Sequence, residues 1–146
     1  MRLRDAEATE GWGHARAERL RPGDGVALFG DLGAGKTTLS RGVLRGLGFE
    51  GDVASRTFPI VQPYGAPEVR LPVWHVDLYR IEDPEELEEL GLGEARHGAA
   101  LLIEWPERMG ALLWSDALRL HLSVAQGGSR SLTAEVPPAW KGRWPV

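Results

Sequence analysis

The octapeptide GDLGAGKT at residues 30–37 constrains this chain more than any other part of its sequence. It matches the pattern G-x-x-x-x-G-K-[ST] at every fixed position. Its glycines allow a tight turn in which successive N–H groups point into one concavity, where phosphate oxygens can bind. Lys36 adds a compact positive charge, and the Thr37 hydroxyl can ligate Mg²⁺. The octapeptide therefore predicts a loop that holds the phosphates of a nucleoside triphosphate.

The residues on either side of this loop have the pattern that such a site requires. Residues 26–29 form an apolar run suited to a buried strand, and residues 37–47 are expected to form a helix that ends at Gly48. The N-terminal end of that helix directs its positive dipole toward bound phosphates. The residues expected to contact the nucleotide here are Asp31, Gly33, Ala34, Gly35, Lys36, Thr37 and Thr38.

Length and composition limit the remaining possibilities. The chain of 146 residues shows no linker and is expected to form a single domain over residues 1–146, with a tail from about residue 137 that is loosely docked. It has no apolar run of 18 residues and no signal-peptide pattern at residues 1–5, so we expect no membrane contact and a cytoplasmic location. The net charge of −4 argues against strong direct binding to nucleic acid.

Alternating helical and strand patterns predict an α/β fold. We expect a three-layer sandwich in which helices cover both faces of a partly parallel central sheet, with antiparallel strands at one side that include a C-terminal hairpin. The expected helices span residues 5–20 and 37–47 and begin again at residue 83; the expected strands span 26–29, 69–79, 99–103, 117–124 and 131–136, and a turn lies at 63–67.

Two acidic residues follow apolar segments and are candidates for holding Mg²⁺ or orienting a water molecule. Glu104 follows ALLI, the Walker-B pattern of four apolar residues and an acid, and Asp77 lies in WHVDLYR. We expect both at the carboxyl ends of strands, where open α/β sheets bind ligands. The catalytic candidates are thus Lys36, Asp77 and Glu104, and the metal candidates are Thr37, Glu104 and Asp77. Either acid could orient the water, and His75 is assigned no chemical role.

The class of nucleotide protein is narrowed further by two observations. Thr57 follows the expected helix by a short loop, where nucleotide switches place a hydroxyl that senses the terminal phosphate and its Mg²⁺. The chain contains no asparagine, so it has no Asn-Lys-x-Asp guanine loop, which favours ATP over GTP. Two other classes remain open: a small-molecule kinase with Arg80, Arg96 and Arg108 as lid arginines, and a module that binds ATP without hydrolysing it and gates a partner.

Five segments in order, GDLGAGKTT, ASRTF, HVDLYR, DPEELEELGL and LLIEWPE, resemble the small bacterial ATPase family TsaE, formerly YjeE. The resemblance covers most of the chain and implies a P-loop NTPase sandwich that hydrolyses ATP during synthesis of threonylcarbamoyladenosine, the modified base beside the anticodon of tRNAs that read codons beginning with A. It further implies docking on a TsaB–TsaD pair, in which TsaD transfers the threonylcarbamoyl group. The ATPase would support repeated turnover of that pair and would meet tRNA through these partners.

The family pattern also implies roles for particular residues. It makes Thr37 and Glu104 ligands of Mg²⁺ and Asp77 a further Walker-type or switch acid. The family contacts adenine where this chain has residues 6–9 and the hairpin tip with Arg130.

One loop departs from the family pattern. The family has Ser-Pro-Thr-Phe where this chain has SRTF at residues 55–58, followed by Pro59. The moved proline shifts the rigid point of the loop and removes an N–H at residue 59. Thr57 remains the switch candidate because its hydroxyl is retained.

Overall fold

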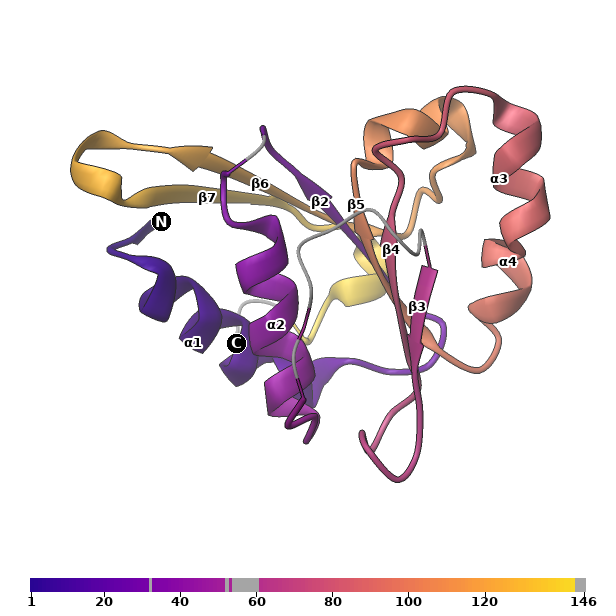
Figure 1. Cartoon of the computed structure of the whole chain (residues 1–146), viewed down its shortest axis with the longest axis horizontal. Helices are drawn as coiled ribbons and strands as arrows, with labels where there is room; N and C mark the ends of the chain where they lie inside the picture. Colours follow the sequence, from indigo (N-terminus) through magenta and orange to yellow (C-terminus); the bar gives the residue numbers. More distant parts are fainter. Residues whose placement is uncertain (32, 52, 54–60, 144–146) are drawn as a thin grey trace.

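The computed structural model of the chain describes residues 1–31, 33–51, 53 and 61–143. Within these residues, a seven-stranded sheet crosses the molecule with its strands in the order β1-β7-β6-β2-β5-β4-β3 (Figure 1). The strands are β1 Arg2–Leu3, β2 Gly25–Phe29, β3 Val61–Tyr64, β4 Val73–Asp77, β5 Ala100–Glu104, β6 Leu118–Val124 and β7 Arg130–Glu135. The expected α/β fold is confirmed.

The four central strands of the sheet are parallel: β6 pairs with β2, β2 with β5, and β5 with β4. Strands buried on both faces of a parallel sheet are almost continuously apolar, and β2 (GVALF) and β5 (ALLIE) have this composition. Strands β6 and β7 form the expected antiparallel hairpin. The antiparallel strands expected at one side are present as β7 and β1, which lie beyond β6; β3 adds a further antiparallel strand beside β4 at the opposite edge, which was not expected.

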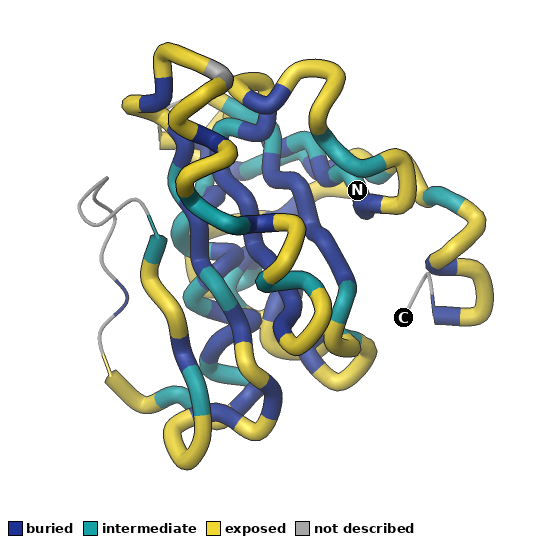
Figure 2. The backbone as a smooth tube through the Cα atoms, turned by 90° about the vertical axis from the view of Figure 1, so that its right-hand side faces the viewer, coloured by how far each residue is buried: buried dark blue, intermediate teal, exposed yellow. Residues whose placement is uncertain are grey.

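Helices cover both faces of the sheet and complete the three layers (Figure 1). Helices α1 (Ala6–Arg16) and α2 (Lys36–Gly46) lie on one face, and α3 (Pro84–Leu90), α4 (Leu92–Ala95) and the 3₁₀ segment η2 (Pro106–Leu112) lie on the other. Because side chains alternate along a strand, Leu102 of β5 faces the first layer while Leu101 and Ile103 face the second. Figure 2 shows the central strands buried between these layers. No helix in the described ranges is both long and apolar enough to cross a bilayer.

Helices α1 and α2 pack with their backbones in close contact. A Cβ atom added at Gly42 would overlap the Glu10 carbonyl group, and one at Gly13 would lie 2.6 Å from the Leu39 carbonyl oxygen. Side chains at these positions would therefore force the helices apart. Gly11, also in α1, faces open space and is not part of this contact.

Several element boundaries differ from those expected. The first helix ends at Arg16 and continues as the 3₁₀ turn η1 (Ala17–Arg19), and the strand expected over residues 69–79 spans only β4. The turn expected at 63–67 begins later, because β3 continues to Tyr64 and includes Pro63 at the sheet edge, where a missing N–H is tolerated. The two-residue strand β1, which pairs with β7, was not expected.

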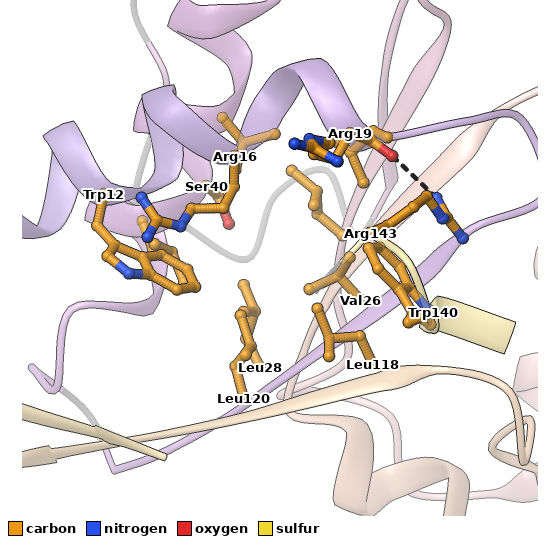
Figure 3. A pocket seen from close by; sticks show the side chains of 14 residues that line it. Trp12, Arg16, Arg19, Val26, Leu28, Ser40, Leu118, Leu120, Trp140 and Arg143 are labelled. Atoms are coloured by element: carbon orange, nitrogen blue, oxygen red, sulfur yellow. Dashed lines mark hydrogen bonds between the residues drawn. The ribbon is translucent and has the colours of Figure 1, made fainter. Parts of the chain in front are cut away.

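The C-terminal segment is packed against the body of the molecule up to residue 143. Trp140, in the 3₁₀ turn η4 (Pro138–Trp140), is 4% exposed. It lines a mainly apolar cavity of about 30 Å³ together with Leu28, Leu118 and Ser40 (Figure 3). The Arg143 guanidinium donates to the Asp24 carboxylate at 2.5 and 2.9 Å. The loosely docked tail expected from residue 137 is therefore wrong for residues 137–143; residues 144–146 lie outside the described residues.

Candidate functional site

The glycine loop connects the carboxyl end of β2 to the first turn of α2, as the sequence predicts. Gly33 and Gly35 have φ values of 81° and 106°, in the left-handed region that favours glycine. Gly30 has a φ of 150°, and an added Cβ there would lie 2.6 Å from the Leu122 carbonyl oxygen of β6. The glycines thus provide both the turn and the close approach to the neighbouring strand, and the N-terminus of α2 opens onto this loop.

Lys36, the first residue of α2, is buried at the centre of the site. Its Nζ atom has no hydrogen-bond partner among the described residues and lies 3.6 Å from the centre of the Trp105 ring. Burial lowers the pKa of Lys36, although the nearby carboxylates of Glu104, Glu107, Asp77 and Asp31 act in the opposite direction. A buried ammonium with unsatisfied donors fits an anionic ligand such as a phosphate group.

The carboxylate of Glu104 lies next to the Thr37 hydroxyl. Thr37 Oγ1 lies 3.2 Å from Oε1 and 3.1 Å from Oε2 of Glu104. Glu104 is only 3% exposed. A hydroxyl and a carboxylate side by side are the oxygen ligands with which P-loop proteins hold Mg²⁺, the remaining ligands being phosphate oxygens and waters. The pair therefore fits the cation. No group of three or more His, Cys, Asp or Glu side chains in the described residues could hold a metal by itself.

Asp77 is the partner of Glu104 in the β4–β5 register, so both predicted acids end neighbouring parallel strands. The Tyr79 N–H donates to Asp77 Oδ1 at 3.0 Å. Burial raises the pKa of Asp77; the Tyr79 hydrogen bond lowers it, and the charge of Glu104 raises it further. The site thus contains two carboxyl groups in different environments, one bonded to Thr37 and one on the adjacent strand.

His75 forms a contact with Glu104 that sequence reasoning did not identify. Its Nε2 atom lies 2.6 Å from Glu104 Oε2, and the residue is buried in β4 two positions before Asp77. A carboxylate that ligates Mg²⁺ is ionised and only accepts hydrogen bonds, and in that state His75 Nε2 would carry the proton and donate. His75 was assigned no chemical role from the sequence, and its partner in the structure is the candidate metal ligand. The alternation in WHVD, which places His75 and Asp77 on the same side of β4, was the available signal.

Trp105, to which the sequence pattern assigns no role in the site, contacts Lys36 of the glycine loop. It has a φ of 59°, a left-handed conformation that costs a non-glycine residue about 1–2 kcal/mol. This conformation turns the chain sharply between Glu104 and Pro106, and the indole packs against both Lys36 and Tyr79, the latter at 5.0 Å between ring centres. Its position directly after the Walker-B acid was the only signal for this role.

Arg130, at the tip of the hairpin, reaches the glycine loop. Its Nη2 atom donates to the Gly33 carbonyl oxygen at 3.0 Å, and its Nη1 atom donates to Gly128 at 2.7 Å. Thr9 of α1 also lies close to this loop, because a Cβ at Gly35 would be 3.7 Å from its methyl carbon. The structure thus brings the predicted residues Gly33, Gly35 and Arg130 together from distant parts of the chain.

The remaining predicted residues fall in three groups. In the glycine loop, Asp31 is exposed and Ala34 is buried, and the Ala34 N–H donates to the Asp31 carbonyl oxygen. Thr38 lies in α2. Thr57 and the SRTFP segment lie outside the described residues. Of the three candidate lid arginines, Arg96 donates to the Gly23 carbonyl oxygen and to Asp116, away from the glycine loop, so it does not act as one.

Comparisons with known proteins agree with the fold and the site. The family model of the threonylcarbamoyl adenosine biosynthesis protein TsaE matches residues 3–132. The tRNA threonylcarbamoyladenosine biosynthesis protein TsaE of Rickettsia prowazekii is 37% identical over 129 residues, 88% of each chain, and that of Bacillus subtilis is 39% identical over 128 residues, 87% of this chain and 78% of the relative.

A solved structure gives the same result for the three-dimensional fold. The crystal structure of Bacillus subtilis YdiB superposes with a TM-score of 0.82 at 30% identity and covers 98% of this chain and 88% of its own. The architecture, the site geometry and the sequence matches agree, and the chain belongs to the TsaE family.

Proposed function

We propose that this chain is an Mg²⁺-dependent ATPase of the tRNA threonylcarbamoyladenosine machinery, acting in the cytoplasm with TsaB and TsaD to support their repeated turnover. The observation that carries the proposal is the buried Lys36 ammonium, which lies at the glycine loop without a hydrogen-bond partner among the described residues. Phosphate oxygens would satisfy its donors and compensate the cost of burying the charge. Membership of a family named for threonylcarbamoyladenosine biosynthesis supports the biological setting.

Each residue of the site has a role in this proposal. Lys36 and the loop amides neutralise the β- and γ-phosphates, and Arg130 holds the loop through the Gly33 carbonyl group. Thr37 and Glu104 would hold Mg²⁺, which supplies positive charge next to the phosphate oxygens when bound. Thr57 remains a proposed switch residue that senses the terminal phosphate.

We assign the orientation of the attacking water to Asp77. Glu104 already interacts with Thr37 and His75, whereas the described residues give the Asp77 carboxylate one hydrogen bond, from Tyr79 N–H. Asp77 therefore keeps acceptor capacity for a water molecule. Its raised pKa also moves it toward the range in which a carboxylate accepts a proton more readily.

The test is to measure phosphate release from ATP labelled at the γ-position, by the chain alone and with a TsaB–TsaD pair. We expect slow release by the isolated chain, because charge in such transition states is often stabilised by an arginine supplied in trans, and strong stimulation by the pair. The Lys36→Ala variant serves as the inactive control.

Each alternative gives a different result. Label transferred to a metabolite rather than released as phosphate would indicate a small-molecule kinase. If the double variant Asp77→Ala, Glu104→Ala still supported full turnover of the pair while Lys36→Ala did not, the chain would be a module that binds ATP and gates a partner without hydrolysis. Either result would replace the proposed function.

A further inference from the structure

An apolar groove lies on the face of the molecule formed by α3, α4 and η2. Its volume is about 290 Å³, and it is lined by the buried side chains of Leu87, Leu92 and Met109 and by the more exposed Leu112 and Trp114. Leu112 is 54% exposed, a large value for a leucine beside other apolar side chains. We call this surface, defined by these five residues, the α3–η2 groove.

The α3–η2 groove also carries negative charge. Glu88 and Glu94 line it directly. Residues 82–94 contain seven of the chain's 21 acidic residues and no lysine or arginine, while the other 133 residues carry 14 acidic and 17 basic residues, a net charge of +3. Neither Glu88 nor Glu94 forms an ion pair with another described residue. Arg96, the basic residue that follows this segment along the chain, is already bound to Asp116.

The apolar lining and the carboxylates of Glu88 and Glu94 together determine which ligands can bind in the groove. A tRNA backbone or an anionic lipid surface would be repelled by these carboxylates. A protein segment that inserts an apolar side chain and carries Lys or Arg at its edges matches both properties, as an amphipathic helix does when it lies in a groove. Complementary charges around such a contact also speed the encounter of the two proteins.

The groove is connected along the chain to the proposed nucleotide site, so a protein bound there could affect that site. Met109 and Leu112 belong to η2, which begins at Pro106, directly after Trp105 and Glu104. Trp105 packs against Lys36, and Glu104 accepts from Thr37. A protein bound in the groove therefore contacts the segment that continues from the residues proposed to hold the phosphates and Mg²⁺.

We propose that the α3–η2 groove is the docking surface for a basic, apolar-anchored segment of the protein partner that stimulates this ATPase. The inference rests on the proposed function, because it uses the partner pair TsaB–TsaD as the probe. It adds the location of the contact and the chemistry of the partner's surface.

The experiment measures the affinity of the TsaB–TsaD pair for the ATP-loaded full-length chain, together with the stimulated rate of phosphate release. The charge variant is Glu88→Lys, Glu94→Lys, and the apolar variant is Leu112→Asp. Glu88 lies in the last turn of α3, where a cation suits the helix dipole, so the fold should tolerate the change. The matched control is Glu18→Lys, Glu50→Lys, which makes the same charge change at exposed sites outside the groove. ATP affinity without the pair verifies that each variant is folded.

We expect both groove variants to bind the pair at least about tenfold more weakly, and the control to bind like the unmodified chain. Added salt should weaken binding of the unmodified chain more than that of the charge variant. Equal binding by all proteins would overturn the inference and leave the proposed function intact. An unmodified chain that binds ATP but neither binds the pair nor is stimulated by it would refute the partner assignment and the inference together. Groove-dependent self-association, or groove-dependent binding of tRNA, would also overturn it.

Discussion

Burial disfavours the charged forms of two side chains of the site, Lys36 at the glycine loop and Asp77 at the end of β4. Burial lowers the pKa of Lys36 and raises that of Asp77, so in both cases the neutral form is favoured relative to the unfolded chain. Trp105 adds a left-handed backbone conformation beside them. Several locally unfavourable features that lie close together are typical of a functional site rather than of a structural core.

This predicts that Asp77→Asn stabilises the protein at neutral pH. Burial raises the pKa of Asp77 in the folded chain, so the stabilising contribution of this group is fully present only below its unfolded-state pKa of about 3.9. That contribution is lost as the pH rises through the folded-state pKa. At pH 7 ionised Asp77 is therefore a cost, which Asn removes. Thermal unfolding in Mg²⁺-free buffer should show a higher Tm for Asp77→Asn at pH 7, with the advantage shrinking toward pH 4. A lower Tm for the variant at pH 7 would contradict the assignment.

The hydrogen bond from His75 to Glu104 predicts that His75 is a positioning residue. His75→Ala should destabilise the fold by about 1–3 kcal/mol, because the buried Glu104 carboxylate loses a donor. It should also weaken Mg²⁺-dependent ATP binding about tenfold, as loss of a partner that orients a metal ligand does. His75→Gln, which keeps an N–H donor, should recover part of both effects. Urea denaturation and Mg²⁺ titrations measure them, and an unchanged Mg²⁺ dependence in His75→Ala would show that His75 is merely structural.

The residues of the site differ in how far the sequence predicts them. Short sequence patterns, in which the chemistry fixes the spacing, predict the glycine loop with Lys36 and Thr37 and also predict Glu104. His75 and Trp105 do not, because their partners lie 29 and 69 positions away along the chain and meet them only in the folded sheet.

At the level of elements, the close packing of α1 against α2 fixes the helix that carries Lys36 and Thr37. The contact depends on the absence of side chains at Gly13 and Gly42. Sequence patterns predicted both helices but not this packing, since a glycine within a helix signals low helix propensity and says nothing about its neighbour. Similarly, the apolar strands β2 and β5 were predictable, whereas β1, with two residues, is too short to show an alternation.

Gly42→Ala is therefore predicted to destabilise the protein although alanine favours helices. The new Cβ would overlap the Glu10 carbonyl group, and overpacking of this kind typically costs about 1–3 kcal/mol. The matched control is Gly11→Ala in α1, where the Cβ meets no atom and the change should be neutral or stabilise by up to about 1 kcal/mol. Chemical denaturation of both variants checks this, and equal free energies of unfolding would refute the packing argument.

At the scale of the whole molecule, the C-terminal segment closes the core on the α1–α2 face. Trp140 covers the cavity next to Leu28 and Leu118 (Figure 3). The Arg143 guanidinium donates to the carboxylate of Asp24, which directly precedes β2. The prediction of a loose tail failed because residues 137–143 (PPAWKGR) show neither a helical nor a strand period from which packing could be inferred. The ion pair that anchors this segment joins residues 119 positions apart.

Trp140→Ala should consequently lower the free energy of unfolding by about 3–5 kcal/mol, a large share of the total of a small domain. ATP affinity measured well below the unfolding midpoint should not change, because Trp140 lines the core cavity and not the glycine loop. Thermal denaturation and calorimetry test the two parts. A Tm like that of the unmodified chain would mean that the tail does not contribute to the core.

The central claim is that Lys36, Thr37 and Glu104 form one site for ATP and Mg²⁺. It is tested most directly by calorimetric titration of ATP, with and without Mg²⁺, into the unmodified chain and Glu104→Gln. We predict that Mg²⁺ tightens ATP binding to the unmodified chain, and that Glu104→Gln loses at least about tenfold of this gain while its Mg²⁺-free affinity is retained. An equal gain from Mg²⁺ in both proteins would contradict the account, because Glu104 would then not be a ligand of the cation.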